Sequence, residues 1–126
     1  PEARALSPSS TTAMTFASSL AIGAGFKPAH FDDLQREIAP GAPGSEGMAA
    51  VDFFEIHAEN HLGDGGAPHR RLRDIGERWP LTVHGVGLSL GGASRPDRAH
   101  LARLRRLLDR HPARIFSEHL AWSSHG

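Results

Sequence analysis

The sequence predicts an α/β fold in which parallel β-strands are joined by helices. Four short apolar segments, at 20–26, 51–59, 81–87 and 113–122, recur at intervals of about 30 residues, and helical patterns lie between them. Strands that alternate with helices in this way run parallel, because each helix carries the chain back across the sheet in a right-handed crossover. The order predicts either an open doubly wound sheet or part of a barrel.

The first apolar segment, LAIGAGF at 20–26, predicts a strand, and HFDDLQREIAP at 30–40 predicts a short helix after it. Residues 1–16 are rich in Ser, Thr and Ala and predict a disordered extension, with Met14 as the expected natural start. Hydroxyl side chains interrupt the apolar stretch that follows, so we do not interpret it as a signal peptide. The predicted domain therefore covers 17–126.

The helix predicted after the second strand lies in 68–79. Leu72, Ile75 and Trp79 recur there at spacings of three and four residues, which puts them on one face of a helix. Pro80 ends this helix, because proline lacks the backbone N–H that a helix interior requires.

The last predicted helix lies in 94–112. Ser94 is its expected N-cap, since a serine hydroxyl can accept a hydrogen bond from a free amide of the first turn. The stripe of apolar residues that should face the sheet consists of Leu101, Leu104 and Leu108.

Alternation along the strands predicts which side chains face the helices. Phe54 and Ile56 share one face of the second strand, and we expect that face to pack on the helices. His57 lies on the other face, and we assign His84 of the third strand and Glu118 of the fourth to the same side. All three lie near the carboxyl ends of their strands, where parallel α/β folds place their chemistry.

These three strand-end residues predict a metal site. Two imidazoles and one carboxylate suit iron, zinc or manganese, and a buried Glu118 without a metal, a cation or a proton would be costly. The alternative is that each histidine is a hydrogen-bonded core residue. Glu59 and Asn60 follow the second strand and are candidates for substrate binding or for contacts that support the ligands. His119 has the opposite parity from Glu118, but strand twist could bring it to the same cavity.

The segment LTVHGVGLSLGG at 81–92 places four glycines after His84. Their spacing matches neither G-x-G-x-x-G nor the P-loop pattern, so a phosphate site is disfavoured. We expect these glycines to let the backbone turn and approach a neighbouring group closely. The histidines on or beside the helices, His69, His100 and His111, are expected to be solvated.

Composition excludes several classes of function. Basic and acidic residues balance at 14 each, which gives no overall charge that favours nucleic acid. The chain has no cysteine, so disulfides, thiolate nucleophiles and cysteine-based zinc sites are excluded, and nine histidines remain as metal ligands. No apolar run is long enough to span a membrane. The cytoplasm is the expected location.

Four motifs give the chain a close resemblance to the multinuclear non-heme iron-dependent oxidative enzymes: FFEIHAENHLGDGG, PLTVHGVGLSLGG, DRAHLARLRRLL and SEHLAWS, in this order. This family includes the methanobactin-biosynthesis oxidase, and the resemblance runs from about Ile22 to Trp122. It implies a TIM-type (β/α)8 barrel, of which this chain would be the N-terminal half with about four strands. It also implies two or three irons that use dioxygen to modify a ribosomally made precursor peptide, often at cysteine, and a helper protein that delivers the peptide.

The resemblance puts iron ligands at His57, His84 and Glu118, with Glu118 bridging two irons. A bound metal, rather than a side chain, would carry out the oxidation. Glu59 and Asn60 would lie around the metal site. Two features depart from the family. His61 stands where an aromatic residue is usual, which would change the rim of the pocket. The sequence also ends before the strands that supply the family's further ligands, so we expect this chain alone to bind metal weakly and to show no turnover.

Two other functions remain open. One is a different divalent-metal TIM barrel, of the sugar-isomerase or zinc-endonuclease type, whose ligands also rise from successive strand ends. The other is a non-catalytic half-barrel module that binds a partner chain and uses its histidines structurally. Neither a nucleic acid nor a membrane is expected as a partner.

Overall fold

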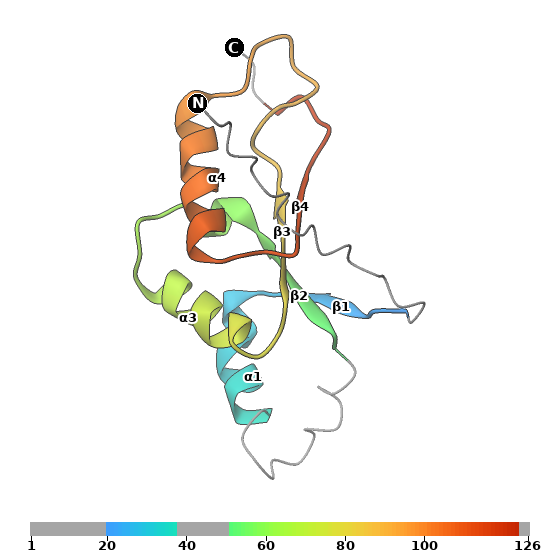
Figure 1. Cartoon of the computed structure of the whole chain (residues 1–126), viewed down its shortest axis with the longest axis vertical. Helices are drawn as coiled ribbons and strands as arrows, with labels where there is room; N and C mark the ends of the chain where they lie inside the picture. Colours follow the sequence, from blue (N-terminus) through green and yellow to red (C-terminus); the bar gives the residue numbers. More distant parts are fainter. Residues whose placement is uncertain (1–19, 38–50, 124–126) are drawn as a thin grey trace, which may run out of the picture.

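A computed structural model describes residues 20–37 and 51–123, which are organised around one four-stranded parallel sheet (Figure 1). Each strand lies beside its neighbour in the sequence, in the order β1 (Gly23–Gly25), β2 (Phe53–His57), β3 (Leu81–Gly85) and β4 (Ile115–Glu118). The α-helices are α1 (Phe31–Glu37), α3 (Ala67–Gly76) and α4 (Arg98–Arg110), and the 3-10 turns are η1 (Pro28–His30) and η2 (Ala58–His61). The predicted α/β fold is confirmed, and the open sheet is consistent with half of a TIM-type barrel.

One face of the sheet packs against α3 and α4, and the apolar core lies between them. The buried side chains come from alternate positions of the strands and from one stripe of each helix: Phe54, Ile56, Leu81, Val83, Leu72, Ile75, Leu104 and Leu107. Full burial of each such side chain stabilises the fold by about 1.5–3 kcal/mol. The prediction that Phe54 and Ile56 face the helices is confirmed.

The start of α4 differs from the expectation. Its N-cap is Asp97, whose carboxylate accepts a hydrogen bond from the Ala99 amide at 2.8 Å, and not Ser94. A carboxylate at this position also carries the negative charge that a helix N-terminus favours, which serine lacks. Within the helix, Leu107 is buried in place of the predicted Leu101, which is 42% exposed.

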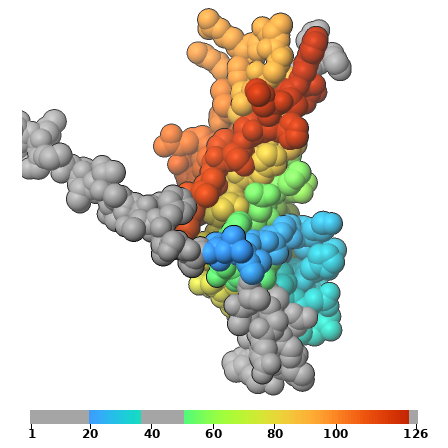
Figure 2. Space-filling model, turned by 90° about the vertical axis from the view of Figure 1, so that its right-hand side faces the viewer, coloured from blue at the N-terminus to red at the C-terminus, as the bar shows by residue number. Residues whose placement is uncertain are grey.

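The other face of the sheet is open (Figure 2). On the side shown there, the strands form the surface, with no described helix in front of them. Ile115 and Phe116 of β4 are 51% and 40% exposed, and β4 lies at the edge of the described sheet. None of the described helices is long and apolar enough to cross a membrane. The predicted extension at 1–16 lies outside the described residues.

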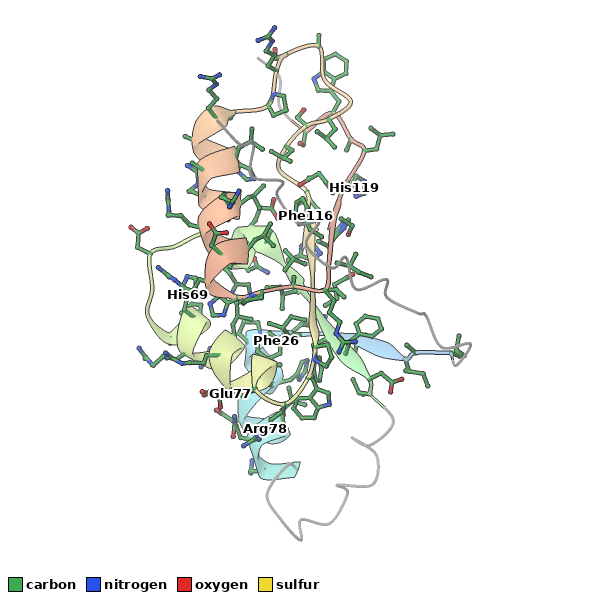
Figure 3. The ribbon with its side chains drawn as sticks, viewed as in Figure 1. Phe26, His69, Glu77, Arg78, Phe116 and His119 are labelled. Atoms are coloured by element: carbon green, nitrogen blue, oxygen red, sulfur yellow. The ribbon has the colours of Figure 1, made fainter. Side chains whose placement is uncertain are left out.

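Three histidines form a buried cluster where η2, α3 and the end of α4 meet. His61 is 2% exposed, and His69 and His111 are each 8% exposed. Nδ1 of His69 lies 2.9 Å from Nε2 of His111, and Nε2 of His69 lies 2.7 Å from the carbonyl oxygen of Gly63; Figure 3 shows His69 in α3, near the end of α4. Because a carbonyl only accepts, a neutral His69 donates from Nε2 and accepts from His111 at Nδ1.

The expectation that His69 and His111 are solvated is therefore wrong, because both are buried and their rings stack on each other. His61 is buried beside them and lines a small cavity with His69 and Leu107. Burial, followed by the nearby His69 and His111, lowers the pKa of His61 to about 4. Its Nδ1 is buried without a hydrogen-bond partner. Burial, followed by the nearby His69, Arg110 and Arg73, also lowers the pKa of His111, so His61 and His111 favour the neutral imidazole.

We predict that the free energy of unfolding falls as the pH is lowered from about 6.5 to about 4. Below the ordinary histidine pKa of 6.5, the unfolded chain takes up a proton at His61 that the folded chain refuses until about pH 4. The loss is about 1.4 kcal/mol per pH unit, or about 3 kcal/mol over the window. Urea unfolding at a series of pH values measures this loss of stability. Above pH 6.5, the titration of His61 should not change the free energy of unfolding.

The His61→Phe variant isolates this contribution. Phenylalanine keeps an aromatic ring in the buried position and removes the titrating group, so the fall in stability should become shallower. His30→Phe changes an exposed histidine of η1 and should keep the wild-type pH profile. A His61→Phe profile as steep as that of the wild type would contradict the assignment.

Candidate functional site

The open face carries a row of histidines at the carboxyl ends of the strands. The register pairs His57 with His84 and His84 with Ser117, so these side chains leave the sheet on the same side. The ring centroids of His57 and His84 are 5.8 Å apart, and those of His84 and His119 are 5.9 Å apart. Figure 3 shows His119 just past the end of β4. The structure thus brings two predicted ligands and one predicted supporting residue together; we call them the histidine row.

Ser117 orients His84. Its Oγ lies 2.8 Å from Nδ1 of His84. When Nδ1 carries the proton, the serine hydroxyl accepts the hydrogen bond, and Nε2 keeps the lone pair that a metal ion or a proton would need. The sequence alone does not single out Ser117 as a site residue, because the face on which it lies depends on the register of β4 with β3.

Glu118 lies on the opposite side of the sheet from the histidine row. The sequence predicts the face of His84 for this residue, but the register pairs it with Gly85, the next residue along β3. Neighbouring residues of a strand point to opposite faces of the sheet. Glu118 therefore lies on the face that the helices cover. Its Oε1 accepts a hydrogen bond from the Leu88 amide at 3.4 Å, and its Oε2 is buried without a partner.

Glu59 holds the loop that follows β3. It lies in η2, directly after β2, and its Oε1 accepts hydrogen bonds from the amides of Val86 at 3.0 Å and Gly87 at 2.8 Å. Together, Glu59 and Glu118 bind three consecutive amides of this loop. Hydrogen bonds to an ionised acceptor are the stronger kind, so these contacts fix the backbone immediately after His84. Asn60, the other predicted residue of η2, is exposed.

Two glycines make room for these carboxylates. A Cβ at Gly85 would lie 2.2 Å from Oε2 of Glu118. A Cβ at Gly87 would lie 2.9 Å from Oε1 of Glu59 and 2.7 Å from Cε1 of His100. Only glycine accommodates contacts this close without displacing the side chains. The expectation that the glycines allow a close approach is confirmed at these two positions.

Glu59 is ionised in this setting. Burial would raise its pKa, but hydrogen bonds from Val86, from its own amide and from Gly87, together with the nearby His100, lower the pKa below its ordinary value. Nε2 of His100 lies 3.5 Å from Oε1 of Glu59, and Nδ1 of His100 lies 3.4 Å from the guanidinium of Arg103. The His100 side chain is 12% exposed, so the expectation that it is solvated is wrong. It connects α4 to the loop instead.

The donors present fit a transition metal in type but not in arrangement. His57 and His84 offer imidazoles on the open face. Glu118 offers a carboxylate oxygen without a hydrogen-bond partner, but this carboxylate lies on the opposite face of the sheet, beside the loop that follows β3. Within 20–37 and 51–123, no three histidine or carboxylate side chains are grouped so that they could hold a metal ion. The described residues therefore do not close a metal site by themselves.

Comparison with known proteins supports the resemblance seen in the motifs. The family described as RiPP precursor modification enzyme MbnB/TglH/ChrH matches residues 21–126. Among curated proteins, the chain is 54% identical over 74 residues to a UPF0276 protein of Paraburkholderia phytofirmans, in a match covering 59% of this chain and 24% of the relative. It is 46% identical over 103 residues to a UPF0276 protein of Bordetella pertussis, covering 82% and 32%. The matched part thus spans about a quarter to a third of these relatives.

We predict that Glu59→Ala lowers the free energy of unfolding by about 1–2 kcal/mol, because it removes the acceptor of the Val86 and Gly87 amides. Hydrogen exchange at these two amides should become faster, since the loop loses its anchor. Urea unfolding and exchange followed by NMR measure the two effects.

The matched control is Glu55→Ala, which removes an exposed glutamate of β2 that lies four residues earlier. It should leave exchange at Val86 and Gly87 unchanged. The anchoring role of Glu59 would be refuted by exchange rates at these amides that are the same in Glu59→Ala and in the wild type.

Proposed function

The chain belongs to the RiPP precursor modification enzyme family MbnB/TglH/ChrH, and from this premise we propose that it forms the amino-terminal half of an enzyme that oxidises a ribosomally made precursor peptide. The proposed reaction uses iron and dioxygen and acts often on cysteine. The peptide is the substrate that the family description implies. A helper protein that delivers this peptide is a further part of the proposal.

The observation that carries the proposal is the histidine row. His57 and His84 lie side by side at the carboxyl ends of adjacent parallel strands, with ring centroids 5.8 Å apart. Barrel enzymes place their chemistry at this end of the strands. The face on which the row lies is covered by no described helix (Figure 2), so a peptide could approach it.

The proposed roles follow the donor types. The proposed iron ligands are His57, His84 and Glu118, and the proposed supporting or peptide-contacting residues are Glu59, Asn60 and His119. Iron, when bound, would supply the redox chemistry that no side chain here offers, and two or three irons are proposed for the complete barrel. His84 would use Nε2 while Ser117 holds Nδ1. Glu118 lies on the other side of the sheet, so its side chain would have to turn toward His84 before Oε2, the oxygen without a hydrogen-bond partner, could join them.

The rest of the coordination sphere would come from further strands of the barrel. Such strands would pair with β4, which lies at the edge of the described sheet, and would cover the exposed Ile115 and Phe116. The relatives are long enough to supply them, since the matched part of this chain covers only 24% to 32% of their length.

The full-length protein, reconstituted with ferrous iron without oxygen, tests the proposal. We expect it to retain iron, and to consume dioxygen and change the mass of a cysteine-containing precursor peptide when both are added. His57→Ala and His84→Ala should each lose most of the iron, because each removes a ligand. His30→Ala, which changes an exposed histidine outside the sheet, should keep the wild-type iron content.

Two results would contradict the proposal. Retention of zinc or manganese without oxygen consumption would point to a divalent-metal barrel of the isomerase or endonuclease type. A metal content that is the same in His57→Ala, His84→Ala and the wild type would point to a non-catalytic module with structural histidines.

We predict that Ser117→Ala weakens iron binding about tenfold, because the partner that fixes the ring and tautomer of His84 is lost. Ser117→Thr keeps a hydroxyl on a β-branched residue that suits a strand, so it should retain most of the affinity. Ser94→Ala removes an exposed serine outside the sheet and serves as the control. Anaerobic titration with ferrous iron measures all three, and equal losses in the alanine and threonine variants would contradict the role of the hydroxyl.

A further inference from the structure

A groove with a basic lining lies between α3 and α4, on the side of the sheet away from the histidine row. It consists of two adjoining cavities of about 480 and 460 Å³, which share Arg73, Arg110 and His111. Figure 3 shows Glu77 and Arg78 beyond one end of α3 and His69 toward its other end. The lining contains one glutamate, Glu77, and five arginines: Arg70, Arg73, Arg78, Arg110 and Arg114.

The floor of this basic groove is apolar. Leu72 and Leu81 line it and are 0% and 4% exposed. Trp79 beside them is half-buried, and its ring packs edge-on against Phe54 at a centroid distance of 5.3 Å. Core packing therefore holds the floor in place, and an apolar side chain could be buried between the charged walls.

The arginines of the basic groove carry charge that carboxylates do not neutralise. In the part of the chain that the structure describes, the ion pairs involve Arg36, Arg105 and His100, none of which lines this groove. Arg110 donates to the carbonyl oxygen of Asp64 at 2.9 Å, which orients the guanidinium without cancelling its charge. Because the whole chain has equal numbers of basic and acidic residues, this groove concentrates positive charge locally.

Helix dipoles explain only part of this concentration. Arg73 and Arg110 lie in the last turns of α3 and α4, where the negative end of the helix dipole favours a cation. Arg70 lies in the first half of α3, and Arg78 and Arg114 lie outside the helices, so the same effect does not account for them.

We propose that the basic groove binds an acidic peptide segment in an extended conformation. Guanidinium groups bind carboxylates through paired hydrogen bonds, and two cavities in a line accommodate a chain rather than a single ion. The apolar floor suits a hydrophobic side chain between acidic ones. Since the groove lies on the helix-covered side, a segment bound there leaves the open face free, and the inference does not rest on the proposed oxidation.

Fluorescence anisotropy with a fluorescein-labelled oligoglutamate peptide tests this inference on the full-length protein. We expect binding that weakens as salt is added, and no binding of the matching oligoglutamine peptide. Arg73→Glu and Arg114→Glu, placed in two different elements, should each weaken binding by about tenfold. Arg98→Glu makes the same change in charge at the start of α4, outside the groove, and should bind like the wild type. Circular dichroism establishes that each variant is folded.

Two results would overturn the inference. Equal weakening by Arg98→Glu would show unspecific attraction to the net charge rather than to the basic groove. Tighter binding of a single-stranded oligonucleotide than of oligoglutamate, lost in Arg73→Glu and Arg114→Glu, would assign the groove to nucleic acid. The assay needs neither iron nor turnover, so its outcome is independent of the iron measurements proposed above.

Discussion

The candidate site depends on the way in which two carboxylates bind the backbone after β3. The amides of Val86 and Gly87 lie beyond the end of the strand, and Oε1 of Glu59 accepts hydrogen bonds from both of them. An ionised acceptor strengthens these hydrogen bonds, and glycine at position 87 leaves room for Glu59. Glycine at position 85 likewise leaves room for Glu118, which accepts from the Leu88 amide. His84 immediately precedes this anchored loop. Its place in the histidine row is therefore set on one side by the sheet register and on the other by Glu59.

The fold could be predicted from the sequence because the signals that define it are local. Four apolar segments separated by helical patterns correspond to the four strands, and the alternation of Phe54 and Ile56 gives the buried face of β2 correctly. Helix ends were less predictable. The choice of Asp97 rather than Ser94 as the N-cap of α4 depends on where the preceding loop enters the helix, and that path is set by contacts with other segments.

The sequence predicts which residue types make up the site better than it predicts where their side chains lie. His57 and His84 lie together as expected, but the side that Glu118 takes depends on the register of β4 against β3, which is a contact between distant segments. The contact of Ser117 with His84 depends on the same register, so the sequence alone does not reveal it. The burial of His61, His69 and His111 depends on three elements that meet only in the folded chain, so a single histidine in a helical pattern gave no sign of it.

The claim that Glu59 anchors the loop as an ionised acceptor is tested most directly by the pKa of its side chain. Carbon-13 NMR of the Glu59 carboxyl group, followed as a function of pH, should give a midpoint below the ordinary glutamate value, because the amide hydrogen bonds and His100 outweigh burial. Removing the imidazole in His100→Ala should raise that midpoint. A Glu59 midpoint at or above the ordinary glutamate value in the wild-type protein would contradict the account.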